Sequence, residues 1–228
     1  MFKTLLGRAH ATLIFARRTR ILSAAICNLL PRDAAILDVG SGDGTIAYSW
    51  RKRRSDLTVQ GIDILVRPET KIPVRAFDGR TIPYDDRSFD VVSFIDVLHH
   101  ANDAEQLLSE ARRVSKNWVI VKDHFAENTW DRATLTLMDW VGNAPHGVSL
   151  PYNYWSRDRW KRAFKTAGLT EAKIETDIPL YAFPLNWIFG RGLHFISLLK
   201  SAEASEVNQA LKYQTNSPTK ISGEQNVP

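Results

Sequence analysis

Short apolar runs alternate, between residues 33 and 123, with stretches whose apolar side chains recur at helical spacing. Five of these runs are continuous enough to predict buried strands. They are 36–39, 57–62, 74–77, 88–95 and 118–121. Helices are predicted to begin near Thr45 and to span 104–114. Strands that alternate with helices predict βαβ units, and therefore an α/β fold with a parallel sheet and helices on both faces.

The pattern changes after residue 125. A further helix is predicted over 128–140, and a loop rich in glycine, proline and aromatic residues follows over 141–154. This loop is longer than a plain connection, and exposure of its aromatic side chains to water would be unfavourable. Residues 125–160 are therefore predicted to form a substrate lid beside a binding crevice.

The last third of the chain predicts a helix over 160–167, stopped by a glycine, and a strand over 169–178. The run 193–199 fits either a final strand or a short helix. In the second case the apolar residues of 183–189 would form an exposed surface for a partner or a membrane. From residue 201 onward large apolar side chains are few, which predicts a disordered tail over 201–228.

Composition indicates one α/β domain over about 33–200. The chain has 228 residues, of which 44% are hydrophobic and 24% are charged, enough to bury a full core. Cys27 is the sole cysteine, so no internal disulfide forms, and a reducing, cytoplasmic location is expected. No run approaches the length of a membrane span.

The positive charge is concentrated at the N-terminus. Residues 1–34 contain six basic residues and one acid, which gives +5, the formal net charge of the whole chain. Leucines and isoleucines lie between these bases, so residues 1–32 are predicted to form a basic amphipathic helical cap. The cap either packs over the crevice or lies on an anionic membrane surface, at its inner face. Nucleic acid is not expected as a partner, because basic and aromatic residues do not recur along one face of the core.

The most informative motif follows the first predicted strand, where three glycines are spaced two apart in Ile-Leu-Asp-Val-Gly-Ser-Gly-Asp-Gly. Glycines let a ligand approach the backbone closely, and the next helix directs its amide groups at the same place. A dinucleotide motif would need glycine or alanine at Thr45. The acids Asp38 and Asp43 would repel a pyrophosphate, whereas they favour the cationic sulfonium and amino groups of S-adenosylmethionine.

At this motif the chain resembles the class I S-adenosylmethionine-dependent methyltransferases, in particular those acting on small molecules. The run Ser-Phe-Asp-Val-Val-Ser-Phe-Ile-Asp-Val-Leu-His-His over 88–100 is similar to the fourth-strand motif of the same family. The resemblance covers about 33–123 well. It implies a Rossmann-like, seven-stranded, mostly parallel sheet whose last strand is antiparallel, and S-adenosylmethionine as the cofactor.

The cofactor site is predicted at the carboxyl ends of the strands. Asp63 ends the second strand, where an acid accepts hydrogen bonds from both ribose hydroxyls. The resemblance places Asp78 on the adenine amino group, although Asp78-Gly79 also fits a plain turn. It places the tip of the fourth strand at the methionine end, and Val97 to His99 near the adenine and the substrate. The predicted cofactor residues are Asp38, Gly40, Ser41, Gly42, Gly44, Asp63, Ile64, Asp78, Gly79, Asp96, Val97 and His99.

Methyl transfer to oxygen or nitrogen needs a base near the acceptor. His124 is the first candidate because a strand tip is a rigid mount, and Asp123, His146 and the two histidines of the fourth strand are further candidates. The acceptor pocket is predicted to be walled by His100, Tyr152, Tyr154 and Trp155. The aromatic character of the lid predicts a small, apolar or lipid-like acceptor.

Two other functions remain open from the residues alone. A nicotinamide-dependent oxidoreductase would share the glycines and Asp63, and a non-catalytic module would use the same fold while the N-terminal helix binds a membrane. No metal site is predicted, because the adjacent histidines His99 and His100 lack a second ligand cluster at suitable spacing. The oligomeric state and the acceptor are left open.

Overall fold

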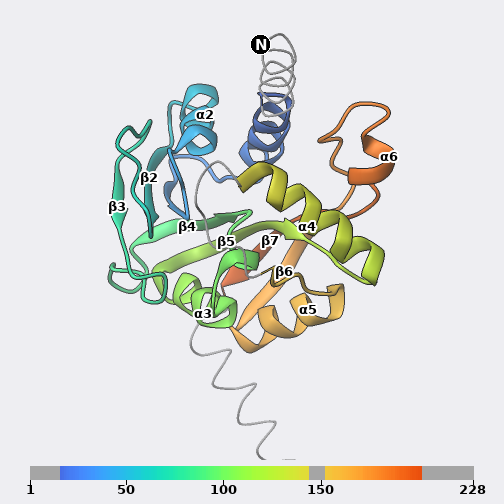
Figure 1. The fold of residues 1–228 in the computed structure, drawn as a ribbon. Coiled ribbons are helices and arrows are strands. Elements are labelled where there is room, and N and C mark those ends of the chain that lie inside the picture. The colour runs from blue at the N-terminus through green and yellow to red at the C-terminus, as the bar shows by residue number, and fades with distance from the viewer. Residues whose placement is uncertain (1–15, 144–151, 202–228) are drawn as a thin grey trace, which may run out of the picture.

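The computed structural model describes residues 16–143 and 152–201, which form a sheet covered by helices on both faces (Figure 1). The sheet has seven strands in the order β3-β2-β1-β4-β5-β7-β6. The strands are β1 (Ala35–Val39), β2 (Thr58–Asp63), β3 (Val74–Ala76), β4 (Phe89–Ile95), β5 (Ser115–His124), β6 (Leu169–Glu175) and β7 (His194–Ser201). The helices are 16–27, α2 (Thr45–Arg53), α3 (Ala104–Val114), α4 (Thr129–Asn143), α5 (Arg157–Thr166) and α6 (Asn186–Phe189), with a 3-10 turn, η1 (Leu98–His100).

The topology confirms the predicted Rossmann-like sheet. Strands β1 to β5 pair in parallel, whereas β7 lies antiparallel to both β5 and β6. The run 193–199 is therefore a strand and not a helix. The strand order reverses between β1 and β4, and ligands of open α/β sheets bind outside the carboxyl ends of the strands at such a point.

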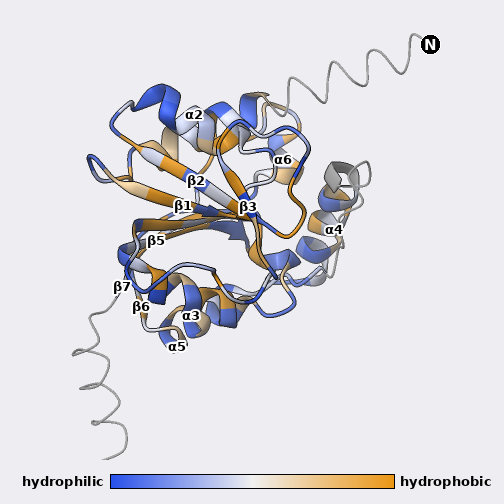
Figure 2. Ribbon diagram, turned by 90° about the vertical axis from the view of Figure 1, so that its left-hand side faces the viewer, coloured by the Kyte–Doolittle hydropathy of each residue, from blue (hydrophilic) through white to orange (hydrophobic). Residues whose placement is uncertain are grey.

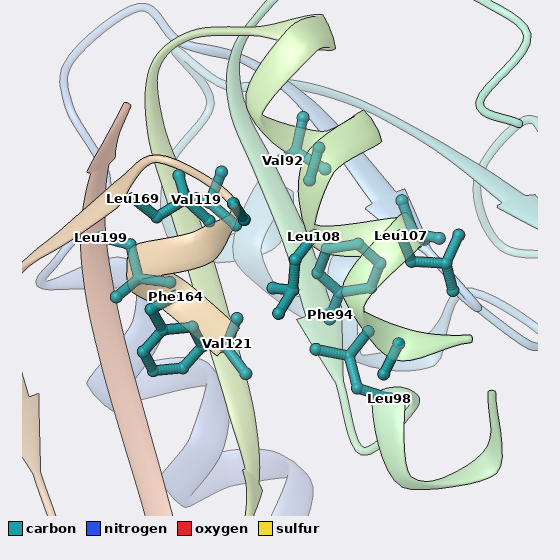
Figure 3. Packing of buried hydrophobic residues seen from close by; sticks show 14 of the residues in the cluster. Val92, Phe94, Leu98, Leu107, Leu108, Val119, Val121, Phe164, Leu169 and Leu199 are labelled. Atoms are coloured by element: carbon teal, nitrogen blue, oxygen red, sulfur yellow. The ribbon is translucent and has the colours of Figure 1, made fainter. Parts of the chain in front are cut away.

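The strands carry apolar side chains on both faces, and these form two hydrophobic clusters. In β4, Val92 and Phe94 face α3 and α5, while Val91 and Ile95 face helix 16–27 and α2. Figure 3 shows the first cluster, with Phe94 packed beside Leu98, Leu107 and Leu108. Figure 2 shows the hydrophobic residues gathered on the central strands. Burial on both faces explains why these strands read as continuous apolar runs.

Local capping fixes where two helices begin. Asp103 precedes α3, and its carboxylate accepts the amide hydrogen of Gln106 at 2.9 Å. Ser156 plays the same part for α5, accepting from the amide of Arg159 at 3.4 Å. The predicted boundaries of α3 are confirmed, whereas α5 begins three residues earlier than expected because Ser156, and not a later residue, caps it.

Other differences from the sequence predictions lie at element ends. Helix α4 continues to Asn143, into the stretch predicted as a loop, and residues 144–151 lie outside the described residues. Ser201, predicted as the start of a tail, pairs with Leu169 as the last residue of β7. The rest of the predicted tail and the first 15 residues of the predicted cap are also outside the described part of the chain.

The described part of the cap packs against the sheet. Leu22 and Ile26 of helix 16–27 are fully buried in the cluster that also contains Trp50 of α2. These apolar side chains are therefore covered by the protein itself. Among the described residues, no helix combines the length and the hydropathy needed to cross a bilayer.

Candidate functional site

The glycine turn after β1 holds its backbone against neighbouring strands. Gly40, Gly42 and Gly44 all have positive φ angles, of 71°, 59° and 75°. A Cβ atom on Gly40 would lie 2.5 Å from Val97, and one on Gly44 would lie 2.5 Å from Ile72. At Gly42, in contrast, no described atom lies within 4 Å of the Cβ position. The turn is thus packed at two glycines and open at the middle one.

Asp63 joins the end of β2 to this turn. Its Oδ2 accepts the amide hydrogen of Gly42 at 2.8 Å, and its Oδ1 accepts that of Leu65 at 2.8 Å. The side chain is half-buried, so part of the carboxylate still faces outward. The structure therefore brings the predicted ribose-binding acid and the open glycine together.

Asp38 lies buried at the same end of β1. It accepts a hydrogen bond from the hydroxyl of Ser93 at 2.8 Å, and no ion pair to Asp38 is found among the described residues. Burial raises the pKa of its carboxyl to about 7 despite this hydrogen bond. The nearby hydroxyl of Ser41 is buried and has no hydrogen-bond partner in the described part of the chain. A cationic group placed beside Asp38 would stabilise its charged form.

Asp43, the second acid of the motif, has a structural contact instead. Its carboxylate accepts from the amide of Thr45 at 2.9 Å and from the hydroxyl of the same residue at 2.6 Å. These contacts hold the first turn of α2. Of the two acids proposed to face a cation, the geometry therefore favours Asp38.

The predicted adenine-binding residues lie together beyond β2 and β3. Asp78 is exposed, and its Oδ1 accepts the amide hydrogens of Arg80 and Thr81, each at 2.8 Å, as in an ordinary turn. Ile64 is 67% exposed, and its Cγ2 lies 3.1 Å from the Cβ position of Gly79. An exposed aliphatic side chain beside an exposed acid can contact one face and one edge of a flat ring. The assignment of Asp78 to adenine stays a prediction.

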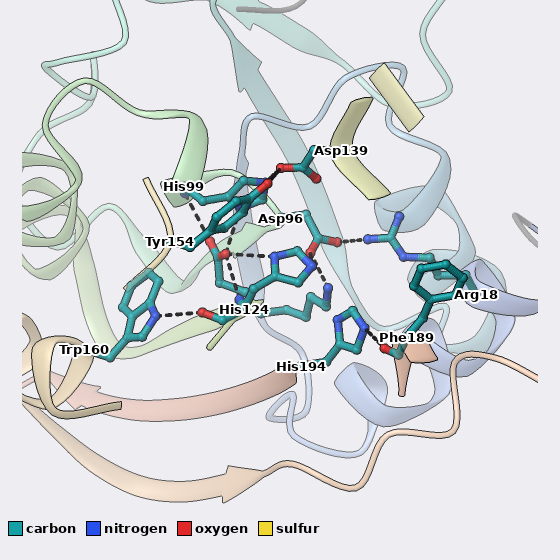
Figure 4. Close-up of polar contacts among 11 residues, drawn as sticks. Arg18, Asp96, His99, His124, Asp139, Tyr154, Trp160, Phe189 and His194 are labelled. Atoms are coloured by element: carbon teal, nitrogen blue, oxygen red, sulfur yellow. Dashed lines mark hydrogen bonds and ion pairs between the residues drawn. The ribbon is translucent and has the colours of Figure 1, made fainter. Parts of the chain in front are cut away.

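A buried charged cluster lies at the tips of β4 and β5 (Figure 4). Asp96, with a φ of 58°, forms ion pairs with Arg18 of helix 16–27 and with Lys122 of β5. Burial alone would raise the pKa of Asp96, but the two cations outweigh it and hold that pKa well below its usual range. Burial lowers the pKa of Lys122. The N-terminal helix is thus fixed to the end of β4 by charge.

His99 is the centre of a second part of this cluster. Its Nδ1 lies 2.7 Å from Oδ1 of Asp123, and its Nε2 lies 3.3 Å from Oδ2 of Asp139 in α4. Burial would lower the pKa of His99, but these carboxylates outweigh it and raise the pKa to about 10. The hydroxyl of Tyr154 donates to Asp139, and the Tyr154 ring stacks on His99. His99 is therefore a buried imidazolium.

His124, the first candidate base, ends β5 and is also buried. Its Nδ1 lies 3.2 Å from Oδ1 of Asp123, and its Nε2 lies 3.6 Å from Oδ1 of Asp96. Burial lowers its pKa well below the usual value, and the nearby Lys122 adds to the shift, so the imidazole is neutral at pH 7. Its carbonyl oxygen accepts from the indole of Trp160 at 3.0 Å.

The remaining predicted residues are not all brought to this place. His100 is half-buried with its ring 3.9 Å from that of His99, and Tyr152 is half-buried near Tyr154. Trp155, predicted to wall the acceptor pocket, packs in the core against Trp160 instead. His146 lies outside the described residues.

Two overlapping groups in this cluster have ligand atoms close enough for a metal ion. They are His99, Asp123 and His124, and His99, His100 and Asp139. Their shared member, His99, is already hydrogen-bonded to Asp123. The charges and hydrogen bonds within the cluster account for its geometry.

The sequence did not assign Arg18, Lys122, Asp139 or His194 to a site. His194 pairs with His124 across β5 and β7, and burial lowers its pKa to about 3. A signal was present for two of them. Lys122 follows the apolar run of β5 directly, and Asp139 falls on the same helical face as Leu135, where an acid is out of place unless it has a partner.

Sequence comparison gives one family match and partial similarity to known enzymes. A family model for a methyltransferase domain matches residues 9–173. A ubiquinone/menaquinone biosynthesis C-methyltransferase of Laribacter hongkongensis is 30% identical over 93 residues, which cover 36% of this chain and 38% of that protein. The 27-O-demethylrifamycin SV methyltransferase of Amycolatopsis mediterranei is 31% identical over 111 residues, covering 42% of this chain and 40% of that protein. The matched part thus spans about two fifths of each relative.

Solved structures share the fold at low sequence identity. A SAM-dependent methyltransferase of Thermotoga maritima superposes with a TM-score of 0.61 at 17% identity, over 88% of this chain and 97% of that one. A geranyl diphosphate C-methyltransferase of Streptomyces coelicolor superposes with a TM-score of 0.56 at 14% identity, over 78% of this chain and 79% of that one.

Proposed function

Because the chain belongs to the methyltransferase domain family, we propose that it transfers a methyl group from S-adenosylmethionine to a small, apolar acceptor. The observation that carries the proposal is the open turn at Gly42, clasped by Asp63. It lies at the point where the strand order reverses, as expected for a nucleoside-binding crevice. The resemblance to class I methyltransferases, first based on the motif around this turn, is confirmed by the family match and the sheet.

The residues around the turn fit this cofactor. Asp63 would accept hydrogen bonds from the ribose hydroxyls while its oxygens keep their contacts to the backbone amides. Exposed Ile64 would pack on the adenine ring, and Asp78 would accept from the adenine amino group. Gly42 would let the ligand lie against the backbone, since nothing described occupies the space above it.

Asp38 would supply the charge that the methionine end requires. A carboxyl whose pKa is about 7 is only partly ionised at neutral pH, and a cationic amino group beside it would lower that pKa and bind in return. The unpartnered Ser41 hydroxyl would provide a further hydrogen bond. A pyrophosphate at the same place would meet a buried acid, which supports the adenosyl cofactor over a nicotinamide dinucleotide.

When bound, S-adenosylmethionine supplies a methyl group on a positively charged sulfur. The protein has to hold the acceptor in line with that carbon. Positioning alone can lower the activation barrier by roughly 7–11 kcal/mol. For an acceptor that must lose a proton, neutral His124 has the form of a base, and Asp123 would orient its ring. Because His124 is buried, it would act as a base only if the acceptor reaches it from the protein surface. That contact is part of the proposal.

The acceptor class is inferred from the aromatic side chains near the cluster. Tyr152 and His100 are half-buried beside buried Tyr154, and the exposed part of their rings suits an apolar molecule. Relatives named for ubiquinone and menaquinone biosynthesis and for geranyl diphosphate support the same choice. Their names describe those proteins, and the acceptor of this chain is part of our proposal.

Calorimetric titration of the full chain tests the cofactor assignment. We expect S-adenosylmethionine and S-adenosylhomocysteine to bind and NADH not to bind. Asp63→Ala should abolish binding, whereas Asp85→Ala, which removes an exposed acid away from the crevice, should not change it. Binding of NADH alone, or adenosyl binding that survives Asp63→Ala, would rule out the proposed site.

A further inference from the structure

Large apolar side chains are exposed on two neighbouring elements, α4 and the segment that contains α6. We call this the α4–α6 surface. It consists of Trp130, Leu137, Trp140, Phe183, Trp187 and Ile188, each more than half exposed. Trp130 and Trp187 are exposed by 76% and 73%. Isolated exposed hydrophobic residues are common, but a group with three tryptophans indicates a binding surface.

Helix α4 has an exposed apolar face and a buried, mainly polar face. Trp130, Leu137 and Trp140 are spaced by seven and three residues, so they lie along one outward face. The opposite face carries buried Leu135 and Asp139, and Asp139 contacts His99 in the charged cluster. One side of α4 thus belongs to the candidate site. On its other side, no described residue buries the tryptophans.

The α6 segment is tied to α4. The guanidinium of Arg191 lies 3.3 Å from Oδ1 of Asp131 and 3.0 Å from Oγ1 of Thr134, both on α4. Figures 1 and 2 both show α4 and α6 at the same side of the sheet. The ring centroids of Phe183 and Trp187 lie 5.3 Å apart. These two exposed side chains therefore continue the exposed apolar face of α4.

The exposed charges within α4 and the α6 segment are positive. The two acids of α4, Asp131 and Asp139, are buried, so Arg132 is the exposed charge of that helix within its described side chains. Residues 182–190 contain no charged side chain. Arg191, paired with Asp131, lies between the two elements and is still 36% exposed. Within the described side chains of these two elements the exposed charges are therefore both arginines, and the exposed acid Glu127, which contacts Arg157, lies just before α4.

We propose that the α4–α6 surface docks onto an anionic lipid bilayer. Indole rings favour the interface between headgroups and acyl chains, and arginine is attracted to anionic headgroups. The surface is distinct from the N-terminal segment, whose described apolar face packs against the sheet. This docking goes beyond the proposed methyl transfer, and its evidence is independent of the cofactor site. It would bring the side of the candidate site bounded by α4 close to molecules dissolved in the bilayer.

Vesicle sedimentation of the full chain tests the proposal. We expect the protein to sediment with vesicles of phosphatidylglycerol and phosphatidylethanolamine more than with vesicles of phosphatidylcholine. Trp130→Ser combined with Trp187→Ser should weaken binding to the anionic vesicles roughly tenfold or more, because two aromatic anchors are lost. Ile174→Ser, which changes an exposed residue of β6, is the matched apolar control and should bind like the original chain.

The electrostatic part has its own pair of variants. Arg132→Glu on α4 should weaken binding to anionic vesicles, whereas Arg162→Glu on α5, with the same charge change at another exposed site, should have a smaller effect. Circular dichroism of the same preparations shows whether each variant is folded, and titration with S-adenosylhomocysteine reports the cofactor site separately. A chain that binds vesicles but no adenosyl compound would contradict the proposed function and leave the docking in place.

Three results would overturn the docking. The original chain could fail to bind anionic vesicles. Binding could survive the double tryptophan variant and disappear when residues 1–15 are removed, which would assign it to the N-terminus. The chain could instead run as a dimer that the double variant converts to a monomer, in which case a second copy covers the surface.

Discussion

Nδ1 of His99 lies 2.7 Å from Oδ1 of Asp123, and both side chains are almost wholly buried. The pair joins η1 to the end of β5, and Asp139 extends it to α4. Removing one partner of a buried ion pair leaves the other charge without compensation. The pair therefore links the stability of the fold to the integrity of the candidate site.

His99→Asn is expected to destabilise the protein by about 3–5 kcal/mol, because Asp123 would stay buried without its cation. The free energy of unfolding, measured in urea, checks this. His100→Asn removes the neighbouring half-buried ring, which has no carboxylate partner among its described hydrogen bonds, and should cost less. Equal losses in the two variants would contradict the assigned role of His99.

The same pair predicts a dependence on pH. The pKa of His99 is about 10 in the folded protein and near 6.5 when unfolded, so its stabilising effect is complete below about pH 6.5. It is then lost as the pH rises through 10. The difference in melting temperature between the original chain and His99→Asn should therefore shrink between pH 6.5 and 10. A difference that stays constant over this range would show that His99 is not charged.

Arg18→Ala is expected to cost about 2 kcal/mol, since it removes a charged hydrogen bond that joins helix 16–27 to Asp96. Asp96 would keep Lys122 as a partner, so the loss should be partial. Arg20→Ala, on the same helix and exposed, should change stability by less than about 0.5 kcal/mol. Chemical unfolding of the two variants side by side makes the comparison.

Gly42→Ala and Gly192→Ala form a matched pair for the cofactor turn. Both positions have positive φ angles, of 59° and 73°, and both have room for a methyl group, so each should cost about 1–2 kcal/mol of stability. Only Gly42→Ala should weaken the binding of S-adenosylhomocysteine, by roughly tenfold or more. If neither variant loses binding, the ligand does not lie against Gly42.

Gly40 and Val97 should behave as a coupled pair. A Cβ on Gly40 would lie 2.5 and 2.7 Å from the two methyl carbons of Val97, so Gly40→Ala is expected to cost about 3 kcal/mol through overpacking and strain. Val97→Ala removes both methyl groups. The double variant should therefore be more stable than the sum of the two single effects, by about 1 kcal/mol. Additive losses would show that the backbone moves away from Val97.

The sequence predicted the elements whose signals are local. The helix over 104–114 was predicted with its observed boundaries, because its apolar spacing lies within one short segment. The glycine turn after β1 and the position of Asp63 at the end of β2 were also predicted, since the strand, the turn and the acid follow each other in a fixed order, while the ribose-binding role of Asp63 stays a prediction. The close contact between Gly42 and Asp63 agrees with that reading.

The charged cluster could not be derived in the same way, because its members come from distant segments. Arg18 and Asp96 are 78 residues apart, and Lys122 is a further 26 residues along the chain. His124 was predicted to stand beside an open crevice. It is buried because β7 runs antiparallel beside β5, in a register that sets His194 opposite it. Periodicity shows which face of a strand is apolar, but not which residue of another strand will cover its tip.

The position of β7 also determines when the molecule can be completed. Because β7 lies between β5 and β6, β6 joins the sheet through a strand that follows it in the chain. In a chain growing from its N-terminus, β5 remains an unpaired edge until Ser201 has been synthesised. The final assembly of this sheet therefore follows translation of almost the whole domain. Until then, the nascent chain exposes the unpaired edge of β5, which can pair with other strands.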